Sequence, residues 1–257
     1  SNTGSGNYLS FASAIADLHC RSTSGPVTFE VADGQIFQET NNLSIRYNGN
    51  HPVTFRKQGN GTNPIIRRVG TSSTSNYILE LLGADNIIFD GIDFEQTGTA
   101  ASSWVEYGIH LTNSNATNGA QHNTFKNGSI SLSNANTNAI GVYCHSTSPI
   151  ATSVSGTNSY NRFINMTVQQ AMQGYRFDNT SSNIQDDGNE VVGENGMRGT
   201  INTLGNGVLS NTIYGIYASE EKNFKVDSID VYGIQATSFS YGIYSNSSDS
   251  STQIFSN

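Results

Sequence analysis

A short phrase recurs along the chain and restricts the fold more than any other feature of the sequence. Its clearest copy is Tyr107-Gly108-Ile109-His110-Leu111, and related copies begin at Ile140, Gln173, Tyr214 and Tyr241. The starts of successive copies lie 33, 33, 41 and 27 residues apart. Self-similarity at a period of tens of residues is typical of a solenoid, in which each repeat forms one coil.

A second phrase alternates with the first. Its copies begin at Asn86, Asn123, Asn161 and, more loosely, Asn223, and a phenylalanine follows each asparagine one to three residues later. Hairpins of a sandwich would not repeat the same two phrases in alternation. The pattern therefore predicts an all-β, single-domain parallel β-helix solenoid of six or seven coils. We expect the four asparagines to form an internal ladder at a turn.

The composition of the 257-residue chain excludes several classes of partner. A net charge of −8 argues against binding to nucleic acid or to an anionic membrane surface. No run of about 18 apolar residues is present, so we expect no insertion into a membrane. Only 35% of the residues are hydrophobic, which suits a narrow solenoid core. The recurring aromatic and β-branched runs argue against disorder.

One amphipathic helix is predicted near the start of the chain, over residues 8–19. Leu9 or Phe11, Ile15 and Leu18 recur at helical spacing, and Ser10 can cap the first turn. We expect this helix to cover the open end of the first coil. The predicted organisation is a cap helix with its lead-in over residues 1–24. A parallel β-helix over residues 25–257 follows, continuing in a longer parent protein.

The two cysteines, Cys20 and Cys144, are expected to lie several coils apart. At about 4.8 Å per coil this is farther than a disulfide can reach. We therefore predict two buried thiols and no disulfide.

The cap helix, the Gly25-Pro26-Val27-Thr28-Phe29-Glu30-Val31 segment and the two phrases together resemble a known architecture. It is the right-handed parallel β-helix with PbH1-type repeats, found in secreted and surface proteins of the Bacteroidota. The resemblance covers nearly the whole chain and implies a secreted or cell-surface location. It implies no particular activity, because similar scaffolds serve lyases, hydrolases, phage tailspikes and adhesins.

The Gly-Ile phrase predicts a row of side chains on the outer surface. Side chains alternate along a strand, so if Ile109 and Leu111 point inward, the residues between and before them point outward. Stacked coils would then align an outward row about 4.8 Å apart, made of His110, Tyr143, Arg176, Tyr217 and Tyr244. A parallel row of glycines would form a floor beside these aromatic rings. We interpret the row as a candidate ligand-binding surface for a glycan, with mutual stacking of tyrosines as the structural alternative.

Three members of that row also match the residue types of a polysaccharide lyase. His110 or Tyr143 would remove the proton next to a uronate carboxylate, and Arg176 would neutralise the carboxylate. No complete catalytic motif accompanies them. The three residues are therefore weak catalytic candidates.

The densest group of acidic residues is Asp186-Asp187-Gly188-Asn189-Glu190. Its oxygen ligands make Asp186, Asp187 and Glu190 weak candidates for a Ca²⁺ site, although the EF-hand spacing is missing. The companion motifs of β-helix hydrolases are absent, which gives little support to hydrolysis by a carboxylate pair. A solvated acidic loop is the simpler interpretation, and no other cofactor is expected.

These observations favour a non-catalytic extracellular or cell-surface module, an adhesin segment or carbohydrate-binding stalk whose partner is a glycan or another cell-surface ligand. Two alternatives stay open. One is a polysaccharide-active enzyme, a lyase ahead of a glycoside hydrolase. The other is a structural element that self-associates by stacking its coils end to end.

Overall fold

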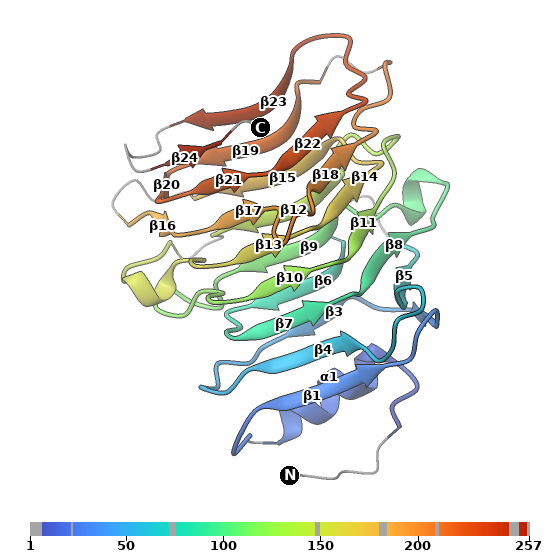
Figure 1. Ribbon diagram of the computed structural model, residues 1–257, viewed down its shortest axis with the longest axis vertical. Coiled ribbons are helices and arrows are strands. Elements are labelled where there is room, and N and C mark those ends of the chain that lie inside the picture. Colours follow the sequence, from blue (N-terminus) through green and yellow to red (C-terminus); the bar gives the residue numbers. More distant parts are fainter. Residues whose placement is uncertain are drawn as a thin grey trace.

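The computed structural model of the chain describes residues 7–21, 23–71, 76–146, 150–179, 184–208, 211–246 and 252–255. One α-helix is followed by strands that form three stacked, all-parallel sheets. In Figure 1 the coils rise from the N-terminal end, where helix α1 lies beside strand β1, to strands β23 and β24 at the other end. The predicted all-β parallel solenoid is confirmed.

Each coil contributes one strand to each sheet. Sheet A contains β1 (Val27–Val31), β4 (Val53–Lys57), β7 (Ile87–Asp90), β10 (Thr124–Lys126), β13 (Arg162–Ile164), β17 (Glu190–Val192), β21 (Lys225–Asp227) and β24 (Gln253–Ile254). Sheet B contains β2 (Ile36–Glu39), β5 (Ile65–Arg68), β8 (Asp93–Gln96), β11 (Ser129–Ser131), β14 (Thr167–Gln169), β18 (Gly199–Asn202) and β22 (Ile229–Tyr232). Sheet C contains β3 (Leu43–Ile45), β6 (Tyr77–Leu82), β9 (Tyr107–Thr112), β12 (Ile140–His145), β15 (Gln173–Asp178), β19 (Ile213–Ser219) and β23 (Ser240–Asn246).

Smaller elements lie at the corners of the coils. Strands β16 (Asp186–Asp187) and β20 (Glu221–Lys222) form a two-stranded parallel sheet, and short 3-10 helices span Ala101–Ser103 and Val154–Gly156. In the described part of the chain, sheets B and C have seven strands each. This number agrees with the six or seven coils predicted. No described helix has the length and apolar character needed to cross a bilayer.

The core is built from identical side chains stacked on successive coils. Sheet A aligns Phe29, Phe55, Phe89, Phe125 and Phe163, whose ring centroids are 4.7, 4.9, 5.4 and 5.4 Å apart and nearly parallel. Three phenylalanines of the second phrase, Phe89, Phe125 and Phe163, therefore share this column, whereas Phe224 lies outside it and Val226 takes the equivalent position. Each ring in the column is covered by the ring of the next coil, which shields it from water. The core can therefore stay narrow and apolar although few residues per coil are apolar.

The helix closes the first coil, as predicted. Helix α1 spans Phe11–Cys20, and the hydroxyl of Ser10 accepts a hydrogen bond from the backbone N–H of Ser13. Its buried face carries Phe11, Ala14, Ile15 and Leu18, and the Phe11 ring meets Phe37 edge-on at 5.0 Å. Leu9 lies before the helix and is exposed, so Phe11 is the anchor of the first turn.

A buried carboxylate fixes the start of this helix. The backbone N–H of Phe11 donates to Glu39 Oε1 at 2.7 Å, and the Glu39 side chain is buried. Replacing Glu39 with alanine leaves a buried helical N–H without an acceptor. We expect the free energy of unfolding to fall by about 2 kcal/mol, measured by urea denaturation. Glu30→Ala, which removes an exposed partner of Arg56, is the matched control and should cost less than about 1 kcal/mol. Equal losses would contradict the anchoring role.

The asparagine ladder forms, but its membership differs from the prediction. Asn123, Asn161 and Asn189 are buried one above the other, and each accepts from the backbone N–H of the coil below through Oδ1. Asn86 and Asn223 instead occupy the preceding position, where the backbone is left-handed with φ of 60° and 50°. Asparagine tolerates this conformation better than most residues. The prediction for these two residues was wrong by one position.

The cysteines are both free thiols. Cys144 is fully buried, as predicted, whereas Cys20 is exposed. Cys20 ends helix α1 on the side that does not face the first coil, so the prediction that it is buried was wrong.

Candidate functional site

The outer surface of sheet C differs from those of sheets A and B. Sheets A and B pair their charges between neighbouring coils, as in Glu30–Arg56, Asp90–Lys126, Arg162–Glu190 and Arg67–Glu95. Sheet C carries the pairs Glu80–His110 and Arg176–Asp178, but it presents mostly aromatic rings. The two charges of an ion pair neutralise each other and need no further partner. Aromatic side chains on a polar surface, in contrast, are common at binding sites.

The strand register places the predicted row in one line, which we call the central column. Its members within the described strands are Ser44, Glu80, His110, Tyr143, Arg176, Tyr217 and Tyr244. All five residues named from the sequence are therefore neighbours on successive coils. Ile109, Val142 and Tyr175 stack beside them on the interior side, which confirms the alignment on which the prediction depended.

A second outward column, the leading column, was missed. It contains Tyr77, Tyr107, Ile140, Gln173, Tyr214 and Tyr241, the residues just before each glycine or its equivalent. The two columns touch: the ring centroids of Tyr107 and Tyr143 are 4.9 Å apart, and those of Tyr214 and Tyr217 are 5.1 Å apart. The recurring tyrosine ahead of the glycine was the available signal.

The predicted glycine floor is wrong. Gly108, Gly141, Gly174 and Gly215 are buried. A Cβ on Gly174 would meet Ile201 Cγ2 of sheet B at 2.8 Å and lie closer still to the carbonyl oxygen of Gly215. The equivalent position on strand β6 is Ile78, whose side chain is fully buried. Alternation fails here because two successive residues, the glycine and the one after it, both face inward.

A hollow of about 400 Å³ lies on this surface at the middle coils. Its lining includes Glu106, Tyr107, Asn138, Tyr143, Gln173 and Arg176. Gln173 adds a buried side-chain oxygen, Oε1, that has no hydrogen-bond partner within the described residues. The hollow thus combines aromatic faces with amide, carboxylate and guanidinium groups, a mixture that can hold a polar ligand with one apolar face.

Arg176 is held rigidly at the edge of the hollow. Its guanidinium carbon lies 5.7 Å from the ring centre of Tyr143 and 5.1 Å from that of Tyr217. Its Nε and Nη2 both donate to Asp178 Oδ2, at 3.1 and 2.6 Å. Burial acts to lower the pKa of this guanidinium, but Asp178 outweighs burial and raises the pKa above its ordinary value. The arginine is therefore fixed and charged, and a carboxylate already neutralises it.

His110 belongs to a buried pair rather than to the open surface. Its Nδ1 lies 3.2 Å from Glu80 Oε1, and only 8% of the residue is exposed. Glu80 also accepts from the hydroxyls of Ser44 and Tyr77. Burial alone would raise the pKa of Glu80, but the hydrogen bonds from His110 and Ser44 outweigh it and lower the pKa. Aligning Tyr77-Ile78-Leu79-Glu80-Leu81 with the Gly-Ile phrase could have found Glu80.

The weak metal candidates take separate partners. Asp186 is fully buried and accepts from the backbone N–H of Asn158 and from Asn179 Nδ2. Asp187 accepts from Tyr160 Oη and Asn223 Nδ2, and Glu190 pairs with Arg162. Across the described ranges no group of three or more His, Cys, Asp or Glu side chains is arranged to hold a metal ion.

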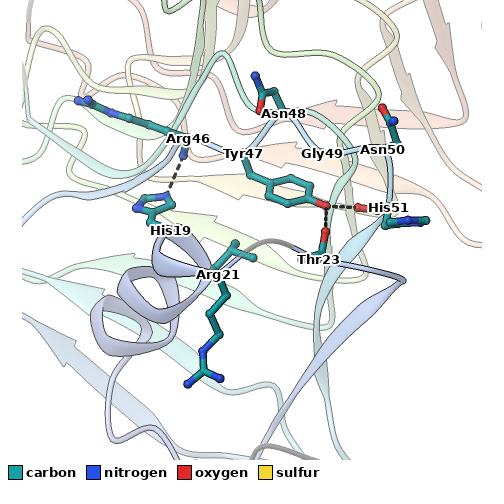
Figure 2. A pocket seen from close by; sticks show the side chains of 10 residues that line it. His19, Arg21, Thr23, Arg46, Tyr47, Asn48, Gly49, Asn50 and His51 are labelled. Atoms are coloured by element: carbon teal, nitrogen blue, oxygen red, sulfur yellow. Dashed lines mark hydrogen bonds between the residues drawn. The ribbon is translucent and has the colours of Figure 1, made fainter. Parts of the chain in front are cut away.

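A second hollow, of about 440 Å³, lies between the end of α1 and residues 46–51. Figure 2 shows the Tyr47 hydroxyl at its centre, hydrogen-bonded to Thr23 and to the carbonyl of His51, while His19 accepts from the backbone N–H of Arg46. The guanidinium groups of Arg21 and Arg46 point away from each other (Figure 2). The cationic residues therefore do not converge on one ligand position.

Comparison with models of known protein families and with curated protein sequences finds no match for this chain.

Proposed function

We propose that the chain is a non-catalytic extracellular module, secreted or on the cell surface, that binds a glycan on sheet C. The observation that carries this proposal is the hollow bordered by Tyr107 and Tyr143 and edged by the clamped Arg176. A sugar ring has an apolar face, which can stack on tyrosine, and a rim of hydroxyls. Asn138, Gln173 and Glu106 supply hydrogen-bonding groups for that rim. The proposed scaffold is a right-handed β-helix of the PbH1 type.

Three features support binding over lyase chemistry. A tyrosine base must lose its proton, but burial raises the pKa of Tyr143 well above its ordinary value. Asp178 already occupies Arg176, which a lyase would need for the substrate carboxylate. His110, the other candidate base, is buried against Glu80. A glycan-binding surface needs neither proton transfer nor a free arginine.

The end-stacking alternative has one observation in its favour. On the last described coil Tyr232, Phe239 and Tyr241 are exposed, and no atom of the described residues lies within 4 Å of the Cβ position of Gly242. A strand edge left open in this way can pair with another chain. None of these residues lines the hollow, so both functions are compatible with the same fold.

Tyr143→Ala should lower glycan affinity at least tenfold, because it removes one of the two tyrosine rings that border the hollow. Binding is first found on a glycan array and then measured by calorimetry with the strongest oligosaccharide. Tyr143→Phe keeps the ring and should retain affinity within about threefold. Tyr232→Ala removes an exposed tyrosine from sheet B and serves as the control. If Tyr143→Ala and Tyr232→Ala bind equally well, the hollow is not the site.

A further inference from the structure

The charge arrangement around Arg176 determines which chemical class of glycan fits the hollow. Asp178 accepts from Nε and Nη2 of Arg176, while the ring centres of Tyr143 and Tyr217, from the two neighbouring coils, lie 5.7 and 5.1 Å from the guanidinium carbon. Only Nη1 lacks a hydrogen bond among the described residues. This nitrogen is a directional donor without an unbalanced charge behind it, which suits a hydroxyl or ring oxygen.

A ligand carboxylate would meet a different environment. To reach Arg176 it must displace Asp178 or share one guanidinium with it, and two carboxylates in close proximity repel each other. Glu106, a buried acidic residue, lines the hollow itself. Burial raises the pKa of the neighbouring Tyr107 hydroxyl, and the charge of Glu106 raises this pKa further. The whole chain carries −8, so long-range steering also disfavours an anion.

We infer that the hollow selects uncharged saccharides and rejects uronate-containing ones, and that Asp178 is the residue that sets this selectivity. The inference rests on the proposed function, since it names the ligand class of the same site. It also predicts how selectivity changes: an arginine released from its carboxylate becomes an anion-binding group.

The test compares one glycan in two chemical states, a uronate oligosaccharide and the same oligosaccharide after reduction of its carboxyl groups to alcohols. Several backbones are screened by calorimetry against the wild type, Asp178→Asn and Asp230→Asn. Asp230 neutralises Arg198 on sheet B, so its variant releases an arginine outside the site and is the matched control. Thermal unfolding verifies that each variant folds.

The wild type should bind the reduced form at least tenfold more tightly than the uronate. Asp178→Asn should shift this ratio toward the uronate by about tenfold, because a charge-assisted contact replaces a repulsion. Asp230→Asn should leave the ratio unchanged. A wild type that prefers the uronate, or an unchanged ratio in Asp178→Asn, overturns the inference but leaves the proposed glycan site standing. If no oligosaccharide in either state binds, the proposed function fails as well.

Discussion

Gly174→Ala is expected to lower the free energy of unfolding by about 3 kcal/mol. The new methyl group would be trapped between Ile201 of sheet B and the backbone carbonyl of Gly215 on the next coil. A flexible side chain could move aside, but the carbonyl belongs to strand β19 and is held by sheet pairing on both sides. Overpacking of this kind is relieved only by separating the coils.

The same column offers a matched control. Gly242 occupies the equivalent position on β23, and none of the described residues would have an atom within 4 Å of its Cβ. Gly242→Ala should therefore change stability by less than about 0.5 kcal/mol. The free energies of unfolding of both variants are measured by denaturant titration, with circular dichroism as the signal. Similar stabilities for the two variants would show that the glycine column is not closely packed.

The second large effect concerns an acidic pair inside the solenoid. Asp186 and Glu221 are register partners on β16 and β20, and neither side chain is exposed. Burial raises the pKa of Asp186 to about 7, although the N–H of Asn158 acts in the opposite direction. Burial, and then the nearby Asp186 carboxyl, raise the pKa of Glu221 well above its ordinary value. Glu221 Oε1 has no hydrogen-bond partner in the described ranges.

The sign of the pH dependence follows from these shifts. Unfolded Asp186 has a pKa of 3.8 and the folded residue one of about 7, so between these values the folded chain binds more protons than the unfolded chain. The contribution of Asp186 to stability is therefore fully present below about pH 4 and is lost as the pH rises to about 7. The loss is on the order of 4 kcal/mol.

Asp186→Asn should remove this loss, because an amide has no charge to bury and its oxygen can still accept from Asn158. The stability difference between variant and wild type should be small near pH 4 and should favour the variant by a few kcal/mol at pH 8, on the order of the loss above. Urea denaturation over this pH range measures it. A flat difference for Asp186→Asn would refute the buried-pair argument.

The sequence predicts the columns of this protein well because they depend on translation from coil to coil. Once copies of the phrase are aligned, His110, Tyr143 and Arg176 must be neighbours whatever the length of the loops between them. It was harder to predict whether a given position faces the core or the solvent. The glycine position faces inward because strict alternation fails beside it, and a sequence pattern gives no sign of such an irregularity.

The partners of three predicted residues were also out of reach. Asp178 was not singled out, because nothing in the phrase indicates that its carboxylate turns back onto Arg176 two residues earlier. The pairing of Asp186 with Glu221 joins residues 35 positions apart in a small sheet outside the repeating phrases. Glu80 was missed because its coil carries Ile78 where later coils carry glycine, which hides its kinship with His110.

Chain distance and spatial order are independent in this molecule. In sheet C, a long connection joins β15 to its neighbour β19, and a shorter one joins β19 to β23. Both pairs of strands nevertheless keep their register. Lengthening a flexible connection costs little free energy. Corner segments can accordingly be exchanged or extended while the strands beneath them stay in place. The stacked strands thus form a constant scaffold. The loops at the corners can change in sequence and length, and with them the ligands they contact, while the scaffold stays the same.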